Sequence, residues 1–164
     1  MSESGIRKAF KAKEENPLKP FMDQDFLLEN DVAKKLYHEY AENMPIYDYH
    51  CHISPCMIYE NYQFQNIGEL MLGGDHYKWR VMLSNGVDEK FIRGDASWHD
   101  KWLAFAASLK YCIGNPMFHW THLELRRVFG IEEILSEKTA EDIWNRANGS
   151  EERRVGKECR SRWS

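Results

Sequence analysis

Residues 45–55 read PIYDYHCHISP, and this stretch carries the main signals for the fold and for a site. The run is short, rich in β-branched and aromatic residues, and closed by a Ser-Pro pair, which predicts a β-strand over residues 46–53. Side chains alternate along a strand. Asp48, His50 and His52 are therefore expected to share one face.

His50 and His52 can serve as two ligands of one metal ion. At a rise of about 3.3 Å per residue they would lie about 6.6 Å apart along the strand, and two imidazoles at that spacing can converge on an ion bound at about 2.0–2.1 Å. The alternative is a pair of hydrogen-bonded histidines at a strand end. The strand context, and a following loop that would leave the ion open to substrate, favour the metal site. Cys51 faces the other way and is expected to be a small core residue.

The rest of the chain shows helical patterns. Upstream, apolar spacing predicts a helix from its N-cap Asn30 to Met44, with Pro45 as the stop. In the helix that follows Asp95, an apolar stripe is expected to face inward at Trp98, Trp102, Phe105, Ala106 and Leu109. The predicted downstream helix starts are Asn66, Asp75, Asp95, Asn115 and Thr139, with stops near Gly86, Gly130 and Gly149.

One strand among helices makes an odd inventory, because a lone strand has no partner for its backbone N–H and C=O groups. The sequence therefore predicts an incomplete fold. Residues 1–18 are interpreted as a polar N-terminal extension, and the Arg-rich residues 151–164 as a non-native tail. Residues 19–150 remain as the folded part.

Length and composition limit the class of protein. A chain of 164 residues can bury one core, but a complete (β/α)₈ barrel takes at least about 200 residues. The formal net charge of −4 gives no general attraction to nucleic acid or to an anionic membrane, and no apolar run is long enough to span a bilayer. We therefore expect a cytoplasmic protein with reduced cysteines that binds a small molecule, not nucleic acid or membrane, and that can form a homo-oligomer.

A second candidate site is GGDHYKWR at residues 73–80. The glycines permit close approach of the backbone, and the helix start directs N–H groups toward whatever binds there. Tyr77 and Arg80 are three residues apart and so share a helix face, which offers a phenol for proton transfer beside a guanidinium for a carboxylate. The alternative is an ordinary capped amphipathic helix that buries Trp79, Met82 and Leu83.

The remaining histidines are weaker candidates. His119 and His122, close to Glu124, have a spacing compatible with metal ligands, but the apolar residues around them are typical of a packed helix. His38 and His99 lie among polar residues and are expected to be solvated.

Five strings carry a family resemblance: PIYDYHCHISP at 45–55, GGDHYKWR at 73–80, NGVD at 85–88, GNP at 114–116 and HWTHLEL at 119–125. Together they resemble the N-terminal part of the uronate isomerase (glucuronate isomerase) family, within the metal-dependent amidohydrolase-like (β/α)₈ TIM barrels. The resemblance extends from about Leu18 to about Asn148. It implies a mostly α-helical fragment with one main strand, in which the first barrel strand is followed by a helical insertion beside the barrel mouth.

The resemblance also implies roles for individual residues. His50 and His52 would be ligands of a divalent metal, with zinc as the first expectation and manganese as the alternative. Tyr77 matches a tyrosine proposed in the family for proton transfer. His76 and Arg80 would line the substrate-binding region.

The implied reaction is that of an aldose–ketose isomerase of hexuronates, which interconverts D-glucuronate with D-fructuronate and D-galacturonate with D-tagaturonate. Family members are several hundred residues long, and the later strands, with the aspartate that completes the metal site, are absent from this chain. The chain is therefore expected to be truncated and inactive alone. Two alternatives stay open: a metal-dependent hydrolase of the same barrel superfamily, and a non-catalytic helical fragment.

Overall fold

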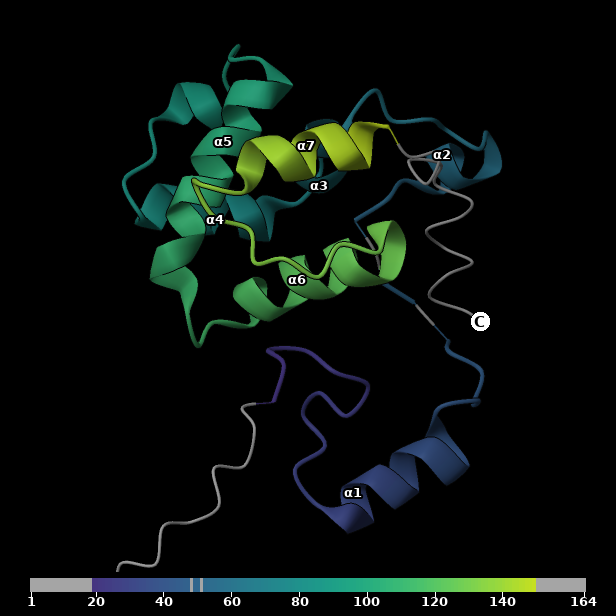
Figure 1. Ribbon diagram of the computed structural model, residues 1–164. Coiled ribbons are helices and arrows are strands. Elements are labelled where there is room, and N and C mark those ends of the chain that lie inside the picture. Colours follow the sequence, from purple (N-terminus) through teal and green to yellow (C-terminus); the bar gives the residue numbers. More distant parts are fainter. Residues whose placement is uncertain (1–18, 48, 51, 150–164) are drawn as a thin grey trace, which may run out of the picture. The chain divides into compact units, whose positions relative to one another are not determined.

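The computed structural model of the chain describes residues 19–47, 49–50 and 52–149 (Figure 1). None of the helices in these ranges has the length and the apolar character that crossing a bilayer requires. Several sequence predictions fall outside the described residues: the extension 1–18, the tail 151–164, and the strand positions Asp48 and Cys51.

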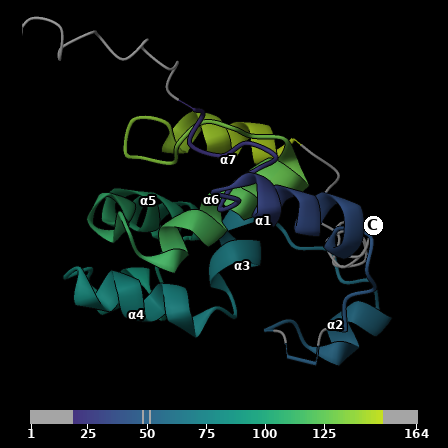
Figure 2. The same cartoon turned by 90° about the horizontal axis from the view of Figure 1, so that it is seen from below.

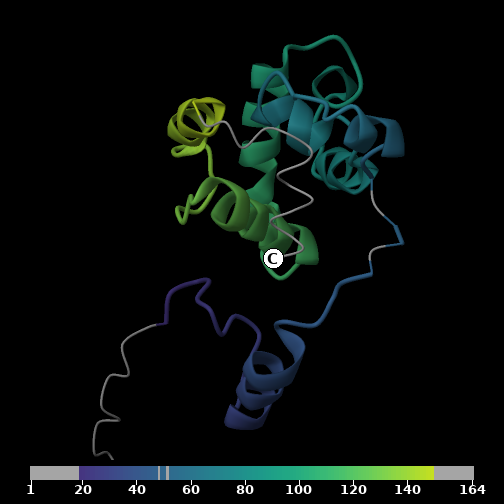
Figure 3. The ribbon, with the colours of Figure 1, turned by 90° about the vertical axis from the view of Figure 1, so that its right-hand side faces the viewer.

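The first of two compact units falls within residues 1–42, and its described part contains one continuous helical segment. In this segment α1 (Asp31–Leu36) passes into a π-helical turn over Tyr37–Ala41 (Figure 3). The Asn30 side-chain oxygen accepts a hydrogen bond from the backbone N–H of Ala33 at 2.9 Å. The predicted start of this helix is confirmed, and the helix ends shortly before the predicted stop.

His38 lies between two carboxylates in this unit. Its Nε2 is 2.9 Å from Asp25 Oδ1, and its Nδ1 is 3.1 Å from Glu42 Oε2. The hydrogen bond to Asp25, and then the one to Glu42, raise the pKa of His38. His38 stays 31% exposed but is also paired, because Asp25, 13 positions upstream, supplies a partner that no local pattern reveals.

The second compact unit, within residues 43–164, is a group of helices arranged around α5 (Figure 2). α5 packs against α3, α4 and α7, and α6 packs against the 3₁₀ turn that follows α5. The helical character of the predicted fold class is thereby confirmed. The helices are α2 (Pro55–Tyr59), α3 (Ile67–Leu72), α4 (His76–Ser84), α5 (Trp98–Ser108), α6 (Pro116–Phe129) and α7 (Ala140–Asn148), with 3₁₀ turns at Glu89–Phe91 and Leu109–Cys112.

Within the predicted strand 46–53, none of the described residues belongs to a strand. Residues 46, 47, 49 and 50 have irregular backbone, residues 52 and 53 form a bend, and no strand occurs elsewhere in the described ranges. The physical reason is that strand N–H and C=O groups need a neighbouring strand, and the described residues offer only a single bridge residue, Gln63. Ser54, at the predicted strand end, instead caps α2 by accepting a hydrogen bond from the N–H of Cys56.

The core of the second unit is centred on Trp102 of α5. Its side chain is fully buried, and its indole N–H donates a hydrogen bond to the carbonyl oxygen of Ala140, the first residue of α7, at 2.9 Å. The inward face predicted for this helix is confirmed, because Phe105, Ala106 and Leu109 are also buried. Other fully buried side chains are Ile67, Met82, Leu125, Leu135 and Ile143.

Most of the predicted helix starts carry the expected cap. Thr139 precedes α7 but makes no side-chain cap hydrogen bond. Asp95 is also an exception, since α5 is capped by Ser97, whose hydroxyl accepts from the Asp100 N–H at 3.1 Å and donates to the Asp100 carboxylate at 2.7 Å. A serine followed three residues later by an acid resembles a capping box, so the sequence contained this signal. Confirmed side-chain caps are Asn66 on Glu69, Asp75 on Tyr77 and Lys78, and Asn115 on Met117.

α3 comes very close to the start of α5 at Gly68. A Cβ atom at this position would lie 2.6 Å from the backbone oxygen of Trp98 and 3.1 Å from a ring carbon of Trp144. A backbone oxygen at a helix start and a ring packed on the core cannot easily move aside. The contact between α3 and α5 therefore requires glycine at this position.

We predict that Gly68→Ala lowers the free energy of unfolding by about 1–3 kcal/mol, the usual cost of an extra methyl group in a packed contact. Gly149→Ala is the matched control. A Cβ at Gly149 would meet its nearest atom at 3.5 Å, and the backbone φ of −76° suits alanine. Urea unfolding followed by circular dichroism measures both variants. Equal stability of the two variants would contradict the close approach of α3 to α5.

His122 of α6 uses both ring nitrogens inside the protein. Nδ1 donates to the carbonyl oxygen of Phe118 at 2.6 Å, and Nε2 accepts the backbone N–H of Leu135 at 2.9 Å. The second bond requires an unprotonated Nε2, because Leu135 offers only a donor. Burial lowers the pKa of His122. The neutral ring is thus a structural link between α6 and the segment before α7.

We predict that His122 makes stability fall as the pH is lowered. Its pKa in the folded chain lies below the ordinary value of about 6.5, so the unfolded chain takes up the proton first and stability declines from about pH 6.5 downward. The urea midpoint at about pH 7.5 and about pH 5.5 should change less in His122→Gln than in the wild type. Comparing the variant with the wild type removes the contributions of other groups, such as His38. An identical pH dependence in the two proteins would disprove the assignment.

Candidate functional site

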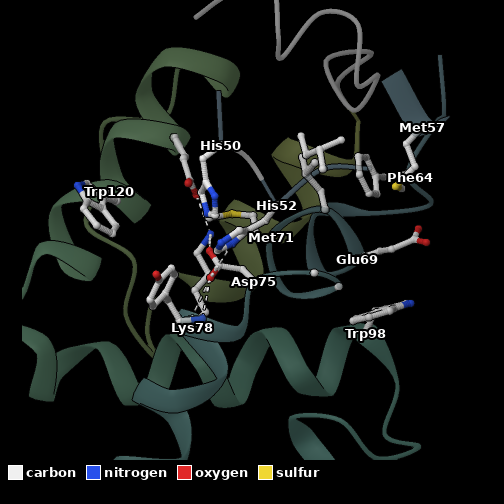
Figure 4. A pocket seen from close by; sticks show the side chains of 16 residues that line it. His50, His52, Met57, Phe64, Glu69, Met71, Asp75, Lys78, Trp98 and Trp120 are labelled. Atoms are coloured by element: carbon white, nitrogen blue, oxygen red, sulfur yellow. Dashed lines mark hydrogen bonds and ion pairs between the residues drawn. The ribbon is translucent and has the colours of Figure 1, made fainter. Parts of the chain in front are cut away.

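A cavity of about 640 Å³ opens in the second unit between the segment that contains His50 and His52, the end of α3, the start of α4 and one face of α6 (Figure 4). Trp98 and Trp120 contribute aromatic surface to its wall. Its polar and titratable lining residues are His50, His52, Glu69, Asp75, Tyr77, Lys78 and Glu124.

His50 and His52 both line this cavity, as the sequence predicted for a metal pair. Their ring centroids are 5.6 Å apart. Two imidazoles that bind one ion at about 2.0–2.1 Å per bond have centroids no more than about 6.5 Å apart, so the spacing fits a shared ion. Two imidazoles are fewer than the three protein ligands typical of a catalytic zinc site. No cluster of three or more metal-binding side chains occurs in the described part of the chain.

The start of α4 lies directly against His52. The His52 ring stacks on the Tyr77 ring with 5.3 Å between ring centroids, and its centroid lies 4.6 Å from that of the His76 ring. A Cβ on Gly74 would come within 3.2 Å of the backbone oxygen of His52, so the glycine permits this approach. Asp75, the N-cap of α4, places Oδ1 3.7 Å from His52 Nδ1, a charge contact longer than a hydrogen bond.

Tyr77 and Arg80 share one face of α4, as predicted. The Arg80 guanidinium lies over the Tyr77 ring, with 5.4 Å from Cζ to the ring centroid. Tyr77 lines the cavity and is 45% exposed. His76 contacts the ring of His52, and Arg80 contacts the ring of Tyr77. Neither His76 nor Arg80 lines the cavity itself. Of the three residues predicted from this helix, Tyr77 reaches the cavity most directly.

Lys78 is the residue of this site that sequence reasoning missed. Its side chain is 3% exposed, and its Nζ lies 2.9 Å from Glu124 Oε2 and 3.4 Å from Asp75 Oδ2. Burial lowers the pKa of Lys78, but attraction and hydrogen bonds from Glu124 and Asp75 outweigh it, so the pKa is raised and the amine stays charged. The spacing of Asp75 and Lys78 was a weak signal. Glu124 is 46 residues away and could not be paired from sequence.

His119, His122 and Glu124 do not combine into a second metal site. His122 uses both ring nitrogens for backbone bonds, and Glu124 faces Lys78 at the cavity. The interpretation of a packed helix is the one that holds.

Comparison with known proteins places this chain in a family. A family model described as glucuronate isomerase matches residues 18–157. The uronate isomerase of Caldanaerobacter subterraneus subsp. tengcongensis is 59% identical over 131 residues, and that of Bacillus subtilis is 56% identical over 131 residues. Each alignment covers 80% of this chain and 28% of the relative, so the chain spans little more than a quarter of the relatives' length.

Solved structures give the same family. A uronate isomerase from Thermotoga maritima superposes with a TM-score of 0.74 at 40% identity, covering 79% of this chain and 28% of that one. A glucuronate isomerase from Caulobacter crescentus superposes with a TM-score of 0.70 at 26% identity, covering 82% and 31%. The resemblance carried by the histidine segment and the α4 start is therefore confirmed: the chain belongs to the glucuronate isomerase family.

Proposed function

We propose that this chain supplies part of the active site of a uronate isomerase. The reaction interconverts an aldohexuronate with its ketose, D-glucuronate with D-fructuronate and D-galacturonate with D-tagaturonate. The proposal rests on one observation: His50, His52 and Tyr77 line the same cavity in a chain of this family. The partner is a small acidic sugar.

His50 and His52 would hold a divalent metal, zinc in the first instance and manganese as the alternative. The centroid distance of 5.6 Å suits a shared ion, and imidazole nitrogen suits both metals. When bound, the metal would polarise the carbonyl oxygen of the open-chain sugar. The family resemblance implies that an aspartate on a later barrel strand completes the ligand set.

In the longer protein, residues 46–53 would form the first strand of a (β/α)₈ barrel. Neighbouring strands would then provide the backbone partners that the described residues lack. His50 and His52 would lie at the carboxyl end of that strand, where barrel enzymes place their catalytic groups. The helices of the second unit would form one wall of the substrate cavity.

The side chains of α4 would handle the substrate. Converting the aldose to the ketose removes the C2 proton, delivers a proton to C1, and shifts the hydroxyl proton from O2 to O1. Tyr77, exposed at the cavity, is positioned to give or take one of these protons. Arg80, whose guanidinium lies over the Tyr77 ring, would recognise the carboxylate of the uronate.

A chimera tests the proposed activity. The 131 aligned residues of this chain would replace their counterpart in the Bacillus subtilis uronate isomerase. We expect the chimera to isomerise D-glucuronate with a kcat of about 1 per second or more, an ordinary enzymatic rate. Tyr77→Phe in the chimera should reduce kcat by about 10²–10⁴-fold, the usual worth of a positioned acid–base group. A folded, metal-loaded chimera with only background turnover would refute the proposal.

The same chimera tests the metal ligands. His50→Ala or His52→Ala should remove most of the bound metal, measured by elemental analysis after gel filtration, because each loses one of few protein ligands. His119→Ala is the matched control and should keep its metal. Equal loss of metal from His119→Ala would show that the site is misplaced.

The 164-residue chain alone should give background rates with glucuronate and galacturonate at any added level of Zn²⁺ or Mn²⁺. Two imidazoles are fewer than the three protein ligands typical of a catalytic zinc site. A turnover of about 1 per second or more by the chain alone would show that it assembles a working site, for instance through a second copy.

A further inference from the structure

We propose that Lys78 is a positioning residue for His52 and acts on it through Asp75. Its buried ammonium holds one oxygen of the Asp75 carboxylate so that the other oxygen faces Nδ1 of His52. The inference rests on the proposed function only where metal binding is measured. The geometry that carries it belongs to the metal-free chain.

The burial of Lys78 demands an explanation, since burying an ammonium is costly unless it is paired. The described chain buries one other lysine, Lys101, whose Nζ donates to the backbone oxygen of Gly94 at 2.7 Å and lies 4.7 Å from the Trp98 ring centroid. That lysine is accounted for by backbone and aromatic contacts. Lys78 instead meets two carboxylates at the wall of the cavity.

Both carboxylate oxygens of Asp75 make contacts that restrict its orientation. Its Oδ1 accepts the backbone N–H groups of Tyr77 at 3.0 Å and Lys78 at 3.2 Å, which fixes the carboxylate at the start of α4. Its Oδ2 lies 3.4 Å from the Lys78 ammonium, which opposes rotation of the carboxylate about its last bond. Glu124 holds the same ammonium from α6 at 2.9 Å, so two helices determine where Asp75 points.

The consequence for His52 concerns its tautomer. A carboxylate beside Nδ1 favours the hydrogen on that nitrogen, which leaves the lone pair of Nε2 for a ligand. Carboxylate partners of this kind commonly orient metal-binding histidines, and losing one typically costs 10–100-fold in metal affinity. At 3.7 Å between Asp75 Oδ1 and His52 Nδ1 the bias comes from electrostatic attraction of the carboxylate for an N–H on Nδ1, without a hydrogen bond.

A purely structural lysine would act differently. If Lys78 only joins α4 to α6, its removal lowers stability and leaves the His52 tautomer alone. If it acts only as a positive charge near the cavity, its removal should strengthen the binding of a cation. The positioning role predicts the reverse, weaker cation binding together with a changed tautomer.

The decisive measurement is the imidazole ¹⁵N chemical shifts of His52 in the metal-free 164-residue chain, at a pH where the ring is neutral. Lys78→Met should move the two shifts toward the average of a mixed tautomer. Lys78→Arg keeps the charge and should restore the wild-type pattern. Lys101→Met, the matched control for removing a buried ammonium, should leave the pattern unchanged. Wild-type shifts in a folded Lys78→Met chain would overturn the proposal.

If Lys78→Met does not fold, Asp75→Asn decides the question. Asparagine caps a helix about as well as aspartate, so this variant should keep α4. The uncharged amide should nonetheless produce the mixed tautomer at His52. Unchanged His52 shifts in folded Asp75→Asn would overturn the proposal, because the route from Lys78 to His52 passes through this carboxylate.

Zinc titration calorimetry separates this proposal from the proposed function. Lys78→Met should bind Zn²⁺ about 10-fold more weakly than the wild type, at the lower end of the range for lost orienting partners. Tighter binding would mean that the ammonium only repels cations, and would overturn the positioning role. If Lys78→Met shows the changed tautomer but the wild-type chain binds no Zn²⁺, the positioning role stands. That result would count against the metal assignment alone.

Discussion

The burial of Trp102, with its indole N–H bound to the carbonyl oxygen of Ala140, is the constraint on which the helical unit depends. A fully buried indole contributes a large apolar surface, but only if its single donor finds an acceptor. Here the acceptor is the first residue of α7, so burying the ring also fixes α7 against α5. α3 then reaches α5 through the space left at Gly68.

This core determines how the cavity is built. α4 packs on α5, and its first turn presents Asp75, Tyr77 and Lys78 to the cavity. The helical wall is therefore held by the core and by the bonds among its own charged groups. The segment that carries His50 and His52 forms no helix or strand at its described residues.

The features that sequence reasoning captured are local. Asn30, Asp75 and Asn115 each cap a helix through a side-chain bond to a residue two or three positions ahead, so the pattern and the structure share the same short stretch. The strand over 46–53 was expected from its local pattern, but a strand also needs a neighbouring strand, which no local pattern supplies. The ion pair of Lys78 with Glu124 could not be predicted from local patterns either, because it joins residues 46 positions apart.

α6 connects Lys78 at the cavity with Leu135, two residues that lie far apart in the sequence. His122 and Glu124 are two residues apart, and at 3.6 residues per turn their side chains leave the helix in nearly opposite directions. One bonds the backbone at Leu135, ahead of α7, and the other bonds the lysine of the cavity. The helix thus works as a rigid spacer with an anchor on each side. The hydrogen bond to Leu135 therefore helps to hold Glu124 at the cavity, although His122 itself does not line it.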